Sequence, residues 1–302
     1  MEKRKLLNSA EKKRYGTRFQ IIDEILEEKK LKYNENSVFH FTSGQALKNM
    51  IETRSLWLSE RQYMNDVLEV DYTKELICEY LNIRFDGARV LKKDINEYVD
   101  FHENQYVFST CTESDLVNMW NYYTNGQGLS DSFCIEFDRQ ELKDIFLAFQ
   151  EKGENFYFGQ VIYRKEDQKS IIFETLDKLI QKSTNKNITT EHRKKIFDKY
   201  NYITEYFYSL CKQEGHSAEK EYRFVFCSNE NSYFEYKRGL FVPTKKIFLK
   251  EIDEDLKLPI KSIMFGPNHY SSIGHKSLKN FLIKNGYKEN EVKIKKSSLS
   301  IR

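Results

Sequence analysis

Short segments rich in Val, Ile, Phe and Tyr recur along the chain, and stretches with helical spacing of apolar residues separate most of them. Five of these segments have the length and composition of central β-strands: 37–42, 56–59, 105–111, 132–137 and 221–227. No internal repeat and no Pro- or Gly-rich linker divides the chain. The pattern predicts one α+β domain with a mixed central β-sheet.

The remaining segments place helices around this sheet. Residues 1–36 are polar and basic apart from a short amphipathic stretch, and we expect an N-terminal helical segment there, before an α+β domain at 37–302. Two long helices, at about 168–182 and 190–212, would form a helical insertion at 168–212. Shorter helices are expected at 45–52, 69–81 and 272–284, and further strands at 156–163, 233–242, 261–265 and 290–296.

Composition excludes several classes of protein. With 39% hydrophobic and 15% aromatic residues the chain can fill a core. Its net charge of +3 lacks the strong basic bias of a dedicated nucleic-acid binder. The five cysteines form no CxxC pair, which favours free thiols in a reducing cytoplasm over structural zinc. Since the sequence shows no secretory signal and no run of about 18 apolar residues, a cytoplasmic protein without a membrane span is expected.

The segment from Ser37 to Gly44 is the first candidate for chemistry. In a strand the side chains alternate between two faces, so His40 and Thr42 point the same way. Ser43 and Gly44 then end the strand before a helix, which places polar groups where a cleft can form. The alternative is a structural histidine whose ring nitrogens are satisfied by hydrogen bonds within a half-buried strand.

A second candidate lies in the late strand that contains Glu221. Glu219, Glu221 and Arg223 would share one face of this strand, and Tyr222 and the following aromatic residues would take the other. Such a Glu-x-Glu-x-Arg pattern can equally be a buried salt-bridge network in a binding or regulatory module.

The turn after the second strand contains Asn65 and Asp66. Either residue can cap the following helix, with Glu69 as the capping-box partner, so we expect all three to support the site structurally. A metal site built from His40, Asp66 and Glu69 fits no known ligand spacing, and no metal is expected.

The order of these segments resembles the bacterial family known as domain of unknown function 2971, over about residues 37–270. The residues that carry the resemblance are Phe39-His40-Phe41-Thr42-Ser43, Leu58-Ser59, Asn65-Asp66 with Glu69, Phe108-Ser109-Thr110-Cys111, Met119-Trp120 with Tyr122 and Tyr123, Gly128, Cys134-Ile135-Glu136-Phe137, and Lys212 with Glu219-Lys220-Glu221-Tyr222-Arg223. Val67 departs from the pattern, because the family usually has proline there.

A more remote resemblance is to ADP-ribosyltransferases of the His-Tyr-Glu type and their toxin relatives. His40-Phe41-Thr42, then Ser59, then Glu221 occupy the same order as the three motifs of those enzymes. The resemblance implies a split central sheet that binds NAD as a substrate, without a Gly-rich phosphate loop. The chain contains neither GxGxxG nor a Walker motif.

The resemblance implies roles for individual residues. Glu221, His40 and Ser59 would be catalytic, with the Glu221 carboxylate stabilising an oxocarbenium ion. Lys212 and Glu219 would support the site. The residues expected to bind NAD are His40, Thr42, Ser43, Trp120, Tyr122, Tyr123 and Arg223. The acceptor would be a macromolecule, either a protein or a nucleic acid, or water. The resemblance points to a toxin or phage-defence effector, and a housekeeping enzyme stays open as the alternative.

Two other functions remain open from the residues alone. In a metal-independent ribonuclease or hydrolase, His40 would act as base or acid, with Glu221 and Arg223 around the scissile phosphate. Lys212, Arg223 and Lys220 would supply the positive charge, whereas Glu219 and Glu221 oppose an anion. In a non-catalytic module, the charged late strand would serve packing alone. No GxSxG elbow supports a serine hydrolase.

Overall fold

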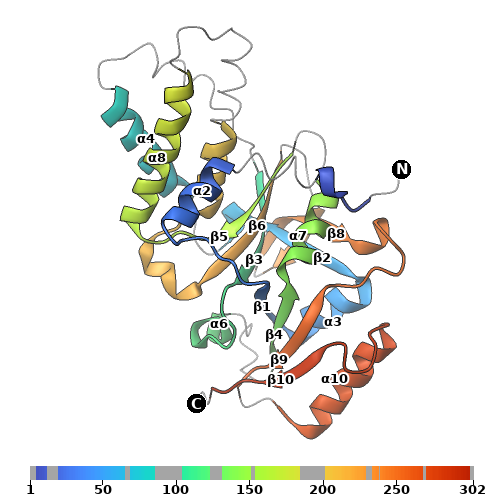
Figure 1. Cartoon of the computed structure of the whole chain (residues 1–302). Coiled ribbons are helices and arrows are strands. Elements are labelled where there is room, and N and C mark those ends of the chain that lie inside the picture. The colour runs from blue at the N-terminus through green and yellow to red at the C-terminus, as the bar shows by residue number, and fades with distance from the viewer. Residues whose placement is uncertain are drawn as a thin grey trace.

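A ten-stranded mixed sheet forms the centre of the molecule in the computed structural model (Figure 1). The structure describes residues 5–11, 20–64, 69–85, 104–122, 131–150, 154–183, 201–228, 233–237, 239–267 and 270–299. The strands are β1 (Ser37–Ser43), β2 (Ser55–Glu60), β3 (Asn104–Cys111), β4 (Ser132–Asp138), β5 (Asn155–Gln160), β6 (Glu221–Ser228), β7 (Tyr233–Lys237), β8 (Leu240–Phe248), β9 (Ile260–Phe265) and β10 (Lys293–Lys296). The predicted α+β fold is confirmed, and the five predicted central strands are β1, β2, β3, β4 and β6.

Strand β3 has three neighbours, and this arrangement divides the sheet. The main path runs β10-β9-β4-β1-β3-β2-β8-β7, while β6 pairs with β3 and β5. The β6 ladder covers the whole of β3, from Asn104 to Cys111. On its opposite edge β3 pairs with β2 at one end and with β1 at the other. All of these pairings are antiparallel, and among the described strands β9 and β10 run parallel to each other.

Four helices pack close to the sheet. They are α3 (Gly44–Thr53), which follows β1, α6 (Val117–Tyr122), α7 (Arg139–Ala148) and α10 (Ser272–Lys284). Figure 1 shows α7 lying across the sheet and α10 beside β9 and β10 at one end of the molecule. The helices expected at 45–52 and 272–284 are confirmed as α3 and α10.

Helix α7 has no counterpart in the sequence analysis, although the chain contains a signal for it. Asp138 is the N-cap, and its carboxylate accepts from the backbone N–H groups of Gln140 and Glu141, each at 3.0 Å. Leu142, Ile145 and Phe146 then follow at helical spacing and are buried. Phe146 packs against Phe108 and Phe224, which places α7 on the main core.

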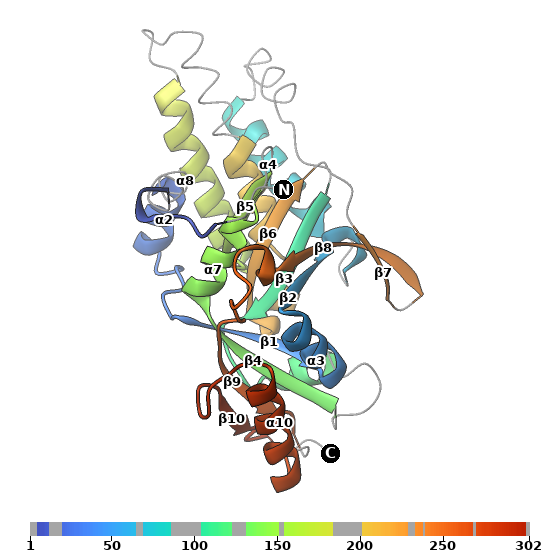
Figure 2. The same ribbon diagram turned by 90° about the vertical axis from the view of Figure 1, so that its right-hand side faces the viewer.

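A helical group occupies the end of the molecule away from α10 (Figures 1 and 2). It contains α2 (Gln20–Glu28), α4 (Glu69–Phe85), α8 (Lys165–Ser183) and the helical residues 201–210. Tyr202, Tyr206 and Phe207 are buried, so the aromatic residues of this last helical stretch pack in the core. Residues 184–200 of the expected insertion lie outside the described residues. No helix in the described part of the chain is long and apolar enough to cross a membrane.

The segment before β6 differs from the prediction. Glu219 does not lie on the strand with Glu221, because residues Glu214–Glu219 form the 3₁₀ helix η3. Lys220 ends this helix with a left-handed backbone, φ 50°, and β6 begins one residue later. Glu221 and Arg223 do share one face of β6, and the buried rings of Tyr222 and Phe224 take the other.

Candidate functional site

A cavity opens where β1 and β2 separate along β3. Ser59 of β2 pairs with Val107, and Phe39 of β1 pairs with Cys111. Among the described strands, neither β1 nor β2 pairs with residues 108–110 between these points. The cavity has a volume of about 1080 Å³ and is lined from β1, β2, β3, α6, β6 and β8. Its floor is therefore the central edge of β3, which the split leaves uncovered.

Six of the residues predicted for the site line this one cavity: His40, Thr42, Ser43, Ser59, Tyr122 and Glu221. They come from β1, β2, α6 and β6, and they are separated by up to 181 positions in the chain. The register and the three-way pairing of β3 bring them together. Ser43 is also the N-cap of α3, because its Oγ accepts from the backbone N–H of Ala46 at 3.3 Å.

His40 is held in one orientation at this split. Its Nδ1 lies 2.9 Å from the carbonyl oxygen of Ser109. Because a carbonyl oxygen only accepts, Nδ1 carries the hydrogen, and in the neutral ring Nε2 is then a hydrogen-bond acceptor and a base. The ring stacks on Phe108, with 4.6 Å between centroids. Burial lowers the pKa of His40, and the bond to Ser109 opposes that shift, so the ring is neutral at pH 7.

Glu221 occupies the first position of β6, opposite Cys111 of β3. Its side chain is nearly buried, and its Oε2 accepts from Arg223 Nη2 at 2.6 Å and from Lys212 Nζ at 3.4 Å. Its backbone N–H donates to the hydroxyl of Tyr163 at 2.9 Å. The carboxylate is therefore part of a buried ion pair and at the same time part of the cavity wall.

Lys212 and Glu219 extend this charged cluster beyond the strand. Lys212 Nζ lies 2.6 Å from Glu219 Oε2, and His216 Nδ1 lies 3.3 Å from Glu219 Oε1. The amide of Gln168 on α8 donates to the backbone carbonyl of Lys212 at 2.7 Å. These contacts connect the helical group to β6 and fix the side of the cavity where Glu221 lies.

Trp120 and Arg223, two of the residues expected to contact NAD, do not line the cavity. Trp120 is 1% exposed, packs edge-on against Phe41 at 4.8 Å, and donates from Nε1 to Asp115 at 2.9 Å. Arg223 is 2% exposed and donates to the Ser209 carbonyl as well as to Glu221. Both side chains stand behind the wall and support it.

Three other predicted residues, Asn65, Asp66 and Tyr123, lie outside the described residues. Glu69 is the first residue of α4, and its side chain lies outside the described part of the structure. The role of Asn65, Asp66 and Glu69 as a helix cap stays a prediction. Among the described residues, no three His, Cys, Asp or Glu side chains are grouped closely enough to hold a metal ion.

The cavity also has lining residues that the sequence analysis did not select. Trp57 and Tyr63 come from β2 and the short helix after it, while Tyr236, Leu240 and Val242 come from the β7–β8 hairpin. The alternating aromatic pattern of 233–242 predicts these strands but does not say that β8 pairs with β2. That long-range pairing is what carries the hairpin to the mouth of the cavity.

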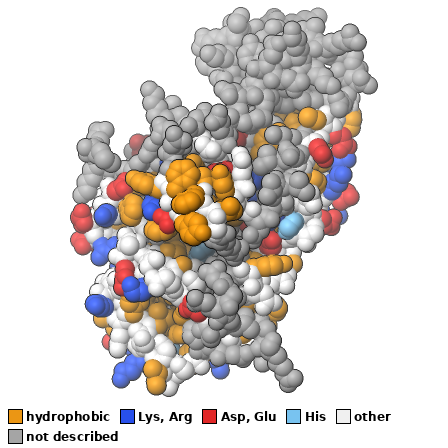
Figure 3. Space-filling model, turned by 180° about the vertical axis from the view of Figure 1, so that it is seen from behind, with side chains coloured by type: hydrophobic (Ala, Val, Ile, Leu, Met, Phe, Trp, Pro, Cys, Tyr) orange, Lys and Arg blue, Asp and Glu red, His pale blue; other side chains and the backbone are white. Residues whose placement is uncertain are grey.

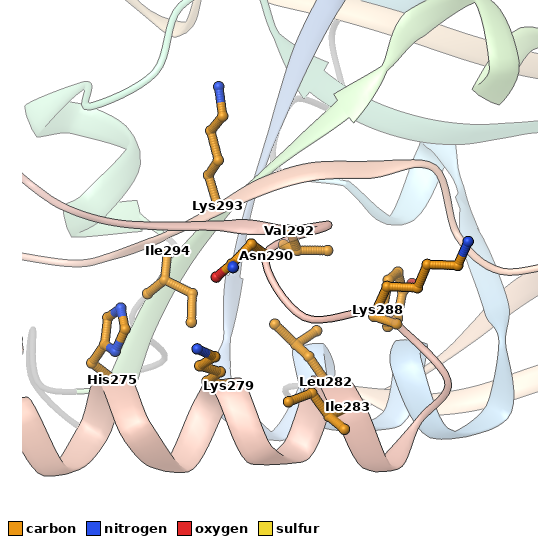
Figure 4. Close-up of a pocket in the computed structure, with 10 residues that line it drawn as sticks. His275, Lys279, Leu282, Ile283, Lys288, Asn290, Val292, Lys293 and Ile294 are labelled. Atoms are coloured by element: carbon orange, nitrogen blue, oxygen red, sulfur yellow. The ribbon is translucent and has the colours of Figure 1, made fainter.

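A second, smaller cavity of about 240 Å³ lies between α10 and β10. Figure 4 shows Leu282, Val292 and Ile294 between the helix and the strand, with the side chain of Lys293 extended away from the helix. Lys279, at its edge, forms an ion pair with Glu289 at 2.7 Å. Its lining mixes apolar side chains with lysines, a histidine and an asparagine, and it contains none of the residues predicted for the site.

Comparison with known proteins gives one match. Residues 119–224 match the model of the family described as "Protein of unknown function (DUF2971)". The matched stretch is about a third of the chain and runs from α6 into β6, so it contains Glu221 but not His40 or Ser59. It supports the resemblance to this family that the order of the segments indicates. No curated protein and no solved structure matches the chain.

Proposed function

We propose that the cavity at the sheet split binds NAD and that the protein transfers ADP-ribose from NAD to a macromolecule or to water. One observation carries this proposal: His40, Ser59 and Glu221, the three residues that resemble the ADP-ribosyltransferase motifs, line one cavity. The volume of about 1080 Å³ is at the upper end of the range of small-molecule sites, as a dinucleotide requires.

The proposed reaction needs charge stabilisation more than acid or base strength. The bond between ribose C1′ and the nicotinamide nitrogen breaks, and its electron pair leaves with neutral nicotinamide. A nucleophile then forms the new bond to C1′ and releases one proton. C1′ is positively charged in the transition state, so a fixed carboxylate in the cavity wall stabilises it. Glu221 is the carboxylate that lines the cavity, and its ion pair with Arg223 holds it in place.

His40 would position the substrate. Because Nδ1 donates to Ser109, Nε2 is the atom that can accept a hydrogen bond from a ribose hydroxyl. The stack on Phe108 prevents the ring from turning away. Thr42, on the same face of β1, supplies a hydroxyl two residues further along the strand.

The diphosphate and the rings of NAD need partners as well. Arg223 is buried behind the wall, so the N-terminus of α3, where Ser43 and Ala46 line the cavity, replaces it as the proposed site for the diphosphate. Tyr122 is 56% exposed and lines the cavity, so its ring can stack on nicotinamide or adenine.

A metal-independent hydrolase is the second candidate, and one observation favours it. The neutral His40, with Nε2 unprotonated, is the form that a general base requires. The carboxylate of Glu221 in the same wall opposes an anionic phosphodiester, which makes this candidate the weaker of the two.

Calorimetry with NAD and an assay of nicotinamide release test the proposal. The wild-type protein should bind NAD and release nicotinamide in the presence of a cell extract that supplies acceptors. Glu221→Gln should bind NAD with similar affinity and release nicotinamide about 10²–10³-fold more slowly. Wild-type protein that neither binds NAD nor releases nicotinamide would rule the transferase out, and RNA cleavage lost in His40→Ala would then establish the hydrolase. We propose that a protein with this transferase activity acts as a toxin or as a phage-defence effector.

A further inference from the structure

The β7–β8 hairpin exposes an unusual number of aromatic rings. Tyr233, Phe234, Tyr236 and Phe241 are each between 62% and 68% exposed, and Leu240 is 53% exposed. Figure 2 shows β7 projecting from the body of the molecule, and Figure 3 shows hydrophobic side chains gathered on the face from which the hairpin projects. Isolated exposed apolar residues are common, but a contiguous group of this kind marks an interaction surface.

The pairing register places three of these rings on one face. Tyr236 pairs with Phe241 and Phe234 pairs with Pro243, so Phe234, Tyr236 and Phe241 lie on the same side of the hairpin. The rings of Tyr236 and Phe241 are 5.2 Å apart between centroids. This face is a row of open rings on which flat ligands can stack.

The hairpin is also basic, although the whole chain is not. Residues 233–248 contain four Lys and Arg residues against one acidic residue, Glu235. Lys245 is paired with Glu154 and Lys246 with Glu235, and the segment as a whole still has more basic than acidic residues. Open rings on a segment with a net positive charge attract an anion that has flat apolar parts.

The exposed rings continue into the cavity. Tyr236, Leu240 and Val242 belong to the hairpin and also line the cavity, together with His40 and Ser59. The connection is built by β8, which pairs with β2 so that Thr244 is opposite Ser59. A polymer lying along the hairpin would therefore pass the cavity mouth.

We propose that the β7–β8 hairpin binds single-stranded nucleic acid, with bases stacked on Phe234, Tyr236 and Phe241 and with phosphates attracted by the net positive charge of residues 233–248. Stacking on exposed rings beside cations is how proteins bind single strands without reading their sequence.

If the bound nucleic acid is also the acceptor of ADP-ribose, this part of the inference rests on the proposed function. A ring nitrogen, amino group or hydroxyl of the bound nucleotide would attack ribose C1′, take the place of nicotinamide and release one proton. As a binding surface, the hairpin can be tested without NAD.

Fluorescence anisotropy with labelled single-stranded DNA and RNA of about 12 nucleotides provides the test. The wild-type protein should bind both strands at low salt. Phe234→Ala and Phe241→Ala should each raise the Kd about fivefold or more, and Phe241→Tyr, which keeps the ring, should retain the affinity. Lys237→Gln should reduce the slope of log K against log salt by about one. Ile273→Ala is the matched control, because Ile273 is 81% exposed on α10 and lies outside the hairpin.

Three results would overturn the inference: no binding of either strand, equal affinity of the Phe variants and the wild type, or binding to phosphatidylserine vesicles in place of the oligonucleotides. Binding of oligonucleotides by a protein that does not bind NAD would keep this inference and reject the transferase. Binding of NAD without oligonucleotides would do the reverse.

Discussion

The Nδ1 atom of His40 in β1 donates to the carbonyl oxygen of Ser109 in β3 at 2.9 Å, where β1 and β2 separate along β3. Ser109 lies between the two points where β2 and β1 pair with this edge of β3. The histidine side chain therefore occupies a position that a strand neighbour fills elsewhere in the sheet. It stabilises the split and presents Nε2 to the cavity.

The lowered pKa of His40 predicts a change in stability with pH. The unfolded chain takes up a proton near pH 6.5, whereas the folded protein does so at lower pH. Stability is therefore full above about pH 6.5 and falls as the pH drops through the folded pKa. Urea unfolding from pH 7.5 to 5 should show this loss. His40→Asn keeps a donor for Ser109 but cannot titrate, so its loss should be smaller; equal losses in both proteins would contradict the assignment.

Glu221→Gln should affect both turnover and stability. The substitution removes the charge that pairs with the buried Arg223, which should lower the free energy of unfolding by about 1–3 kcal/mol. Nicotinamide release should fall by about 10²–10³-fold at a temperature where the variant is still folded.

Asp138→Ala is the matched control for this variant. It removes the N-cap of α7 and should cost about 1–2 kcal/mol, but Asp138 does not line the cavity. Turnover should remain at the wild-type level. If both variants lost turnover equally, Glu221 would act through stability alone.

Trp120 and Tyr122, two residues apart on α6, should behave differently on substitution. Trp120→Ala removes a buried ring that packs on Phe41 and should cost about 3–5 kcal/mol in thermal or urea unfolding. Tyr122→Ala should change stability by no more than about 0.5 kcal/mol and raise the KM for NAD, because this ring lines the cavity. An unchanged KM would remove Tyr122 from the proposed site.

The helix-cap role of Asn65 and Asp66 remains a prediction. Asp66→Ala should lower the free energy of unfolding by about 0.5–2 kcal/mol, as the loss of an N-cap does, and should leave activity in place. Thermal unfolding together with the nicotinamide assay measures both. Wild-type stability with complete loss of activity would assign the residue to catalysis.

Local patterns predicted most of the strands and helices, because alternation and helical spacing depend only on residues that are close together in the sequence. The alternation in β1, the apolar run of β3 and the helical spacing of α10 are examples. Helix α7 was not predicted, although Asp138 and Glu141 carry a capping signal for it. Glu219 was placed on β6 because alternation does not reveal the left-handed turn at Lys220.

The cavity itself depends on contacts that no local pattern contains. The sequence motifs select His40, Ser59 and Glu221, but the edge of β3 that each neighbouring strand occupies is set by long-range packing. The same limit explains Trp120 and the β7–β8 hairpin. A Trp next to tyrosines on α6 can face either a core or a cleft, and pairing of β8 with β2 is what brings Tyr236 to the cavity.

The pairing of β3 with three other strands also determines when a growing polypeptide acquires its site. Strands β1, β2 and β3 are synthesised first, yet they share only a few residue pairs with one another. The long ladder that holds β3 comes from β6, which ends at Ser228. An emerging chain therefore has no cavity wall at Glu221 until β6 has left the ribosome. Any chemistry that needs the complete cavity would begin only after that point in synthesis.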